Sequence, residues 1–219
     1  EPEYCDAYTY ATLANEARLA RGFEPKYNAT EMELFRTGLD PDLYPNTNWR
    51  DVILRDHVWQ NQEFLSIAGG GTAARYYVSL SILSKDGVFK QDKNTHDYNT
   101  NVGYTKYSFL SKVDANLTKT TTLSMKLNQV MVDNDGPGLS DNGSLWSAQA
   151  NLTPVTMPVR YSNGQLSSYG SNGSQISPYV QLNYMGYKQN RRLNTDLSVG
   201  INQNLDFITK GLNVRGLFS

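Results

Sequence analysis

The side chains that could do chemistry are few, and the most conspicuous pattern is a run of three glycines within SIAGGGTAARYYVSLSI (66–82). A glycine-rich phosphate loop needs a lysine after the glycines and a helix whose N-terminus faces the phosphate. No lysine follows this run, and residues 74–82 alternate in polarity as a strand does. The run therefore predicts a tight reversal between two strands, because glycine turns the backbone without steric cost.

Two other patterns could bind a metal or activate a nucleophile, and both are weak. DNDGPG (133–138) has the oxygen-rich side chains of a calcium loop, but the ligand spacing of an EF-hand is broken. His57 and His96 lie far apart with no partner at ligand spacing, and no G-x-S-x-G is present. The sequence predicts no catalytic residue, no metal and no cofactor, and therefore no enzyme.

Aromatic residues among Asn, Asp and Ser are the better candidates for binding. The four candidates are Tyr98, Trp146, Tyr161 and Tyr169. A flat apolar ring beside hydrogen-bonding edges suits a sugar or a peptide. The alternative is that these rings pack their segments against themselves or against a partner protein, since exposed aromatics serve interfaces as often as ligands.

Composition excludes some classes of protein. The formal net charge of the 219 residues is -1, which offers no basic field for nucleic acid, and the single cysteine, Cys5, excludes an internal disulfide framework. No apolar run is long enough for a membrane-spanning helix. Strands of a membrane barrel need only about 10 residues, with polar side chains at every second position, so they escape hydropathy averages.

Residues 1–56 have helical patterning. Asp6 predicts the N-cap of a helix over 7–21, and Thr30 with Glu33 predicts a capping box for a second, short helix. The apolar face of the first helix would hold Tyr10, Leu13, Ala14 and Ala17. This segment is too short to hold a large core alone.

From Gln60 onward the period of the pattern changes to two, which predicts six antiparallel strands. The connections between them alternate in length: the short ones lie at 69–73, 119–121 and 208–211, and the long ones span about 90–103 and 133–193. Short turns at one end and long loops at the other are typical of an outer-membrane barrel.

The two faces of the predicted strands differ in polarity. One face is apolar throughout, and the other carries Lys112, Asp114, Lys126, Asn202 and Arg215. Charges suit the wet lumen of a barrel, whereas unpaired charges in the core of a sandwich would be costly. The fold class is therefore predicted as all-β, a segment of a large transmembrane barrel. A soluble carbohydrate-binding sandwich with one solvated face is the alternative.

Several segments resemble the SusC/RagA family of TonB-dependent outer-membrane transporters. YPNTNW (44–49) is similar to a Tyr-Pro-Asn-Thr-Asp-Trp-like stretch of that family, with Asn48 where Asp is common, and NQEFLSIAGGGTAARYYVSLSILSKDGVF (61–89) is similar to the two strands that follow it. Further similar segments are ANEAR (14–18), RTGLDP (36–41) and ITKGLNVRGLFS (208–219). They occur in matching order and spacing, and the segment from Asp133 to Leu193 is the least similar part.

The resemblance implies a barrel of about 22 strands with a plug domain inside. Such a protein imports oligosaccharides or peptides, with TonB supplying the energy and a SusD-like surface lipoprotein as partner. Six strands cannot enclose a wide lumen, so this chain is expected to be a piece of the wall in contact with outer-membrane lipid. Residues 1–56 would be most of a helical external loop and 57–219 the wall, with the plug and the TonB-contact segment outside this chain.

Overall fold

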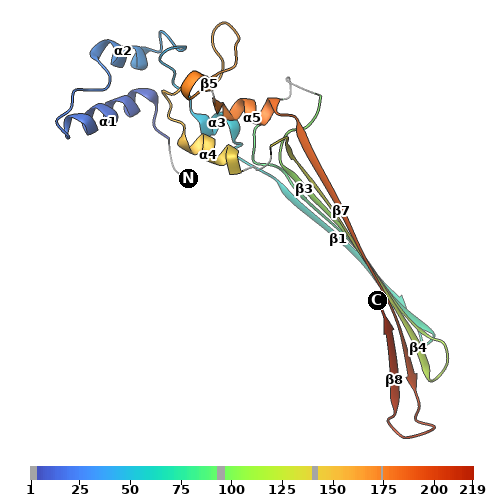
Figure 1. The fold of residues 1–219 in the computed structure, drawn as a ribbon. Helices are drawn as coiled ribbons and strands as arrows, with labels where there is room; N and C mark the ends of the chain where they lie inside the picture. The colour runs from blue at the N-terminus through green and yellow to red at the C-terminus, as the bar shows by residue number, and fades with distance from the viewer. Residues whose placement is uncertain (1–3, 93–96, 140–142, 174) are drawn as a thin grey trace. The chain divides into compact units, whose positions relative to one another are not determined.

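The computed structural model describes residues 4–92, 97–139, 143–173 and 175–219. Its main element is a six-stranded sheet in the order β1-β2-β3-β4-β7-β8 (Figure 1). The strands are β1 (Gln60–Gly70), β2 (Ala74–Lys85), β3 (Gly103–Asn116), β4 (Thr121–Pro137), β7 (Tyr187–Asn204) and β8 (Asn213–Phe218). Among the described residues, no helix is long and apolar enough to cross a membrane.

Neighbouring strands of the sheet are antiparallel, as the sequence predicted. Backbone pairing is antiparallel between β1 and β2, β2 and β3, β3 and β4, and β7 and β8. Between β4 and β7, side-chain hydrogen bonds join Thr121 to Gln203 and Asn128 to Asp196, so that the residue number rises along one strand as it falls along the other. Each strand of this sheet thus pairs with the next strand of the same sheet along the chain.

The glycine run forms the reversal between β1 and β2, which confirms the prediction. Gly70 ends β1 with a φ of +144°, a conformation that favours glycine. The amide of Gly71 donates a hydrogen bond to the carbonyl of Ala74 over 2.8 Å. A Cβ atom on Gly70 would lie 2.4 Å from that same carbonyl oxygen, whereas one on Gly71 would meet nothing within 4 Å. Only the first of these two positions therefore requires glycine.

The strands are longer than their alternation predicted. β4 continues to Pro137 and β7 begins at Tyr187, so the connection between them covers 138–186 and not 133–193. The prediction ended the strands too early because polar residues such as those of 133–135 break the apolar alternation, although their backbone still pairs with β3. The connection also holds α4 (Gly143–Asn151), α5 (Pro178–Tyr184), the short pair β5 (Ser168–Tyr169) and β6 (Gln175–Ile176), and a 3-10 turn at Ser171–Gly173.

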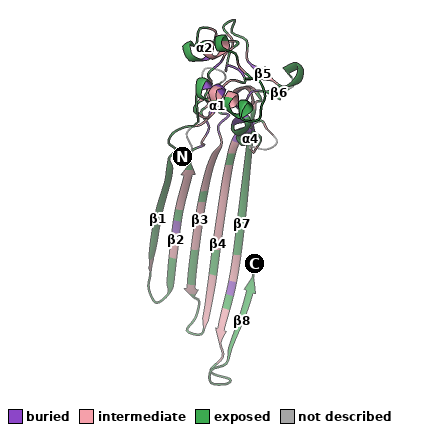
Figure 2. Ribbon diagram, turned by 90° about the vertical axis from the view of Figure 1, so that its left-hand side faces the viewer, coloured by how far each residue is buried: buried purple, intermediate pink, exposed green. Residues whose placement is uncertain are grey.

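Register divides the sheet into two faces, because residues directly opposite one another on neighbouring strands project to the same side. One side, here called the apolar face, holds Leu65, Ile67, Val78, Leu80, Phe109, Val113, Met125, Leu127, Leu197, Val199, Ile201, Val214 and Phe218. The intervening positions form the polar face. Figure 2 shows that few positions along these strands are buried. The predicted separation of apolar and polar residues is confirmed along the middle of the strands, whereas Glu63 and Asp133 also stand on the apolar face, opposite Ile82 and Thr105, so that face is not apolar throughout.

The first helix, α1 (Ala7–Leu19), begins where the sequence predicted but packs through a partly different face. The Asp6 carboxylate accepts a hydrogen bond from the amide of Thr9 at 2.7 Å. The buried residues are Ala7 and Ala11. Of the predicted apolar face, Tyr10 and Ala14 are half-buried, whereas Leu13, 54% exposed, and Ala17 are exposed, so that face is confirmed only in part. The two alanines pack in one buried cluster with Phe35 of the next helix, because their small side chains allow a close approach.

The second helix, α2 (Ala29–Thr37), has its capping box two residues before the predicted one. Asn28 accepts from the amide of Glu31, and the Glu31 carboxylate accepts from the amide of Asn28. Glu33 instead accepts two hydrogen bonds from Arg36. Thr30 and Glu33 lie inside the helix, where a capping box has no orphan amide to satisfy.

The chain divides into two compact units. The connection unit is Glu1–His57, Val88–Val102 and Gly136–Lys188, and the sheet unit is Val58–Gly87, Gly103–Asp135 and Gln189–Ser219. Three separate segments therefore make up the connection unit, which the expected division at residue 56 did not anticipate.

The connection unit has its own apolar core drawn from all three segments. Ile53 of α3 (Trp49–Ile53), Phe89, Leu145 of α4 and Leu182 of α5 form one buried cluster. A second cluster joins Trp49 to Leu152 and Met157. The segments that separate the strands thus fold together, because both of these clusters need side chains from more than one of them.

A buried asparagine ties two of these segments together, and its removal tests the unit. The side chain of Asn183, 1% exposed, accepts from the amide of Asp92 at 2.8 Å and donates to the carbonyl of Tyr179 at 3.0 Å. We expect Asn183→Leu to lower local stability by about 1–3 kcal/mol, the cost of breaking buried hydrogen bonds. Hydrogen exchange at residues 88–92 should accelerate, while Asn151→Leu, at an exposed position ending α4, should leave it unchanged. Unchanged exchange in both variants would contradict the role of Asn183.

Candidate functional site

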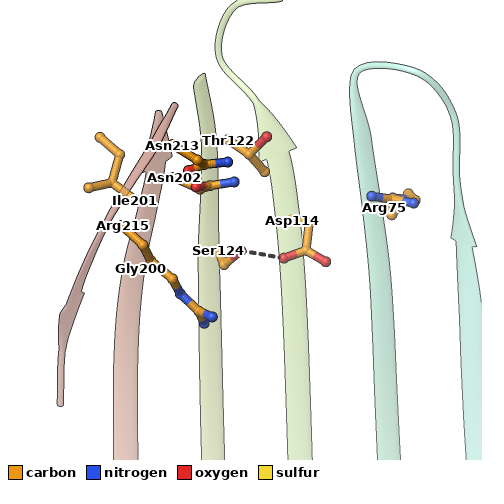
Figure 3. A pocket seen from close by; sticks show the side chains of 9 residues that line it. All are labelled: Arg75, Asp114, Thr122, Ser124, Gly200, Ile201, Asn202, Asn213 and Arg215. Carbon is orange, nitrogen blue, oxygen red and sulfur yellow. Dashed lines mark hydrogen bonds between the residues drawn. The ribbon is translucent and has the colours of Figure 1, made fainter. Parts of the chain in front are cut away.

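The polar face is hollowed near the short turns of the sheet. A hollow of about 560 Å³ is lined there chiefly by polar side chains, which Figure 3 labels. They are Arg75 of β2, Asp114 of β3, Thr122 and Ser124 of β4, Asn202 of β7, and Asn213 and Arg215 of β8. Five strands contribute to it, since alternate residues of each strand project to this side.

Few of these side chains are bonded to one another. The Ser124 hydroxyl donates to the Asp114 carboxylate over 2.6 Å, the dashed line of Figure 3. A neighbouring hollow of about 280 Å³ shares Asp114, Ser124 and Arg215 and adds Lys112 and Lys126. The site therefore presents cations, hydroxyls, amides and the Asp114 carboxylate to whatever enters it.

The lining of the two hollows is suited to binding a polar molecule. Within the described ranges, no group of three or more His, Cys, Asp or Glu side chains is placed to hold a metal ion. His57 is exposed, and its Nδ1 lies 2.7 Å from the carbonyl of Asp56, while His96 lies outside the described residues. Cations beside hydroxyls and amides bind anions and polyols through charge-assisted hydrogen bonds.

The four aromatic candidates all lie in the connection unit, in different surroundings. Trp146 of α4 is 44% exposed, with its ring centroid 5.7 Å from that of the buried Phe89. Tyr98 packs on Tyr187 at 5.2 Å between centroids. Tyr169 lies half-buried against the cluster of Trp49, and Tyr161 lies half-buried in a turn closed onto Gln165. Of these four residues, only Trp146 is exposed, and the other three are half-buried.

A second polar group lies in the connection unit around two tyrosines of α5. The Tyr179 hydroxyl donates to the Asp92 carboxylate at 2.7 Å, and Arg160 donates to the Tyr184 hydroxyl at 3.3 Å and to the carbonyl of Gly164 at 2.7 Å. The hydrogen bond to Tyr184, followed by one to Tyr179, raises the pKa of the Arg160 guanidinium above its ordinary value. These contacts hold the turn around Arg160 and Gly164 against α5 and favour the charged form of the Arg160 guanidinium.

Side chains of the apolar face are widely exposed, as expected of a surface that contacts lipid or another apolar surface. Leu65, Leu80 and Leu197 are 63%, 43% and 48% exposed. A soluble monomer rarely exposes so continuous an apolar surface. The described residues form one six-stranded sheet and one two-stranded pair, so the described part of the chain does not supply the second large sheet that a sandwich needs.

Comparison with known proteins gives a partial match. No protein-family profile matches the chain. It is 26% identical over 130 residues to a curated protein of Formosa agariphila named TonB-dependent receptor P26. The matched region is 59% of this chain and 11% of that receptor, so the chain spans a small part of its relative's length. The similarity supports the TonB-dependent receptor family, whose members are outer-membrane transporters, and does not distinguish the SusC/RagA branch.

The sequence prediction missed the cationic character of the polar face. It named Lys112, Lys126 and Arg215 as lumen charges but drew its conclusion about charge from the whole-chain value of -1. Arg75 and Lys106 join them on the same face once register is known. Counting charge on alternate positions of each strand, and not over the whole chain, would have found them.

Proposed function

We propose that this chain forms part of the wall, and the external segments, of a TonB-dependent outer-membrane importer. The observation that carries the proposal is a single antiparallel sheet with an exposed apolar face, a polar face and connections that alternate between short and long. Closed barrels are the β structures that satisfy their backbone within a membrane, and their strands alternate in this way. The partial similarity to a TonB-dependent receptor points the same way.

In the proposed orientation the short turns face the periplasm and the long connections leave the strands at the exterior. Tyr76 and Tyr107 then lie near the two membrane interfaces, where tyrosine is enriched. On β2, Tyr76 lies six residues from Ile82, the direct partner of Tyr107. That spacing corresponds to roughly 20 Å along the strand, comparable to the apolar band of about 25 Å on such barrels.

The cargo under this proposal is an oligosaccharide or a peptide. It would first meet the external connection unit, where Trp146 offers an exposed ring beside polar neighbours. Tyr98, Tyr161 and Tyr169 would support that surface through their packing. A SusD-like lipoprotein would cover it from outside, and TonB would act through a part of the protein that lies beyond these residues.

The proposal is tested with the full gene product in its native cells. The protein should fractionate with outer membranes, and uptake of its cargo should stop when TonB is deleted. A soluble carbohydrate-binding module, the second candidate, is favoured only by the aromatic residues. Recovery of the protein in the soluble fraction would contradict the importer proposal and favour the soluble module.

A further inference from the structure

The polar face of the sheet carries far more positive charge than the chain as a whole. Among the backbone-paired positions of β1 to β4 and of β7 with β8, six cations project from this face: Arg75, Lys85, Lys106, Lys112, Lys126 and Arg215. Asp114 is the one carboxylate among those same positions, so six against one leaves a formal charge of +5, whereas the whole chain has -1. On β7, alternation places Lys188, Arg192 and Asp196 on this face, two cations and one carboxylate.

These cations are spread along the strands from end to end. Lys85 and Lys106 lie towards the long connections, Lys112 and Lys126 lie further along, and Arg75 borders the hollow near the short turns. The six together are here called the cationic track. Charges of one sign lining a low-dielectric wall concentrate counter-ions and steer charged molecules along it.

One pair in the track shows that stability does not account for the arrangement. Lys112 and Lys126 stand directly opposite one another on β3 and β4. Like charges at opposed positions destabilise a sheet. Both lysines line the smaller hollow together with Arg215, and Asp114 is the one carboxylate there. An anion bound between the lysines would relieve this repulsion and gain charge-assisted hydrogen bonds.

The remaining lining of the larger hollow identifies the kind of anion. Thr122, Ser124, Asn202 and Asn213 offer hydroxyl and amide groups beside the arginines. Such groups match densely spaced sugar hydroxyls. Resting on the proposed function, we propose that the cargo is an anionic oligosaccharide, bearing carboxylate or sulfate groups, which the cationic track guides past the wall.

The test measures binding of three hexasaccharides to the purified full-length receptor: a galacturonate, a sulfated galactan and a neutral galactan. At least one anionic probe should bind more tightly than the neutral one. The double variant Lys112→Gln/Lys126→Gln should weaken that binding about tenfold or more, since charge-assisted hydrogen bonds are the stronger class. The matched control Lys210→Gln removes a lysine from the turn between β7 and β8 and should leave the affinity unchanged.

Three outcomes would overturn the proposal. One is preference for the neutral hexasaccharide or no binding of either anionic probe, and another is equal affinity in the double variant and the control. In the third, the double variant changes the protease sensitivity of the receptor without changing its affinity, which would assign the lysines to an acidic segment of the receptor's own chain. Each of these outcomes leaves TonB-dependent uptake and outer-membrane fractionation intact, so failure here is distinct from failure of the importer proposal.

Discussion

Gly70→Ala is expected to reduce the folded yield of the receptor severalfold, while Gly71→Ala should have no measurable effect. At Gly70 a Cβ atom would lie 2.4 Å from the carbonyl oxygen of Ala74 and 2.5 Å from Cα of Arg75. Both obstacles are backbone atoms, which cannot rotate away. The φ of +144° adds strain of order 1–3 kcal/mol for a residue with a side chain. At Gly71 the same atom meets nothing within 4 Å.

Relief of this clash must displace the start of β2. Gly70 pairs with Arg75, the first of the regular pairs that fix the β1–β2 register. A slip of one residue would turn every apolar side chain of a strand to the polar side. The measurement is the fraction of receptor that refolds in detergent and resists unfolding until heated. Equal folded fractions for the two alanine variants would show that the reversal tolerates a side chain at both positions.

A lysine at Leu80 should destabilise the membrane-inserted protein by about 2–4 kcal/mol, the cost of a cation on the lipid face near the centre of the bilayer. Leu80 lies within the apolar face, directly opposite Leu65 and Phe109. Ser81→Lys is the matched control, one residue further along β2 and on the polar face. The Ser81→Lys substitution should leave the free energy of unfolding almost unchanged. Urea unfolding of both variants in lipid vesicles gives the comparison.

A second readout separates lipid contact from burial against another sheet. Spin labels on Leu80→Cys and Ser81→Cys would be compared, with Cys5 replaced by serine. The label at residue 80 should be accessible to oxygen, which partitions into lipid, and the label at residue 81 to a water-soluble nickel complex. A label at residue 80 that neither reagent reaches would indicate a protein-covered face and favour the soluble module.

The alternation of apolar and polar residues predicted most of the sheet. The two faces of the sheet follow from a period of two, and short turns that contain glycine indicate that neighbouring strands are antiparallel. The ends of the strands were less predictable, because Asp133 pairs through its backbone and through the Arg191 side chain, at 2.6 Å, while breaking the apolar pattern. Backbone pairing does not depend on the polarity of the side chain.

The connection unit could not be predicted from local pattern. Its core depends on residues such as Trp49 and Met157, which lie in different connections and show no shared period. Among the binding candidates, the sequence could name aromatic residues but not their exposure. Tyr169 and Trp146 occupy similar polar stretches, yet one packs into a cluster while the other remains exposed.

The discontinuous make-up of the connection unit has a consequence for the order of folding. The cluster of Ile53, Phe89 and Leu182 draws on three stretches of chain between which the first four strands run. Contacts across such sequence distances form late, because the intervening loop must be closed first. The core of the unit can therefore close only after β1 to β4 have passed back and forth. A protease site that becomes protected as this core closes would therefore report when strands β1 to β4 have formed.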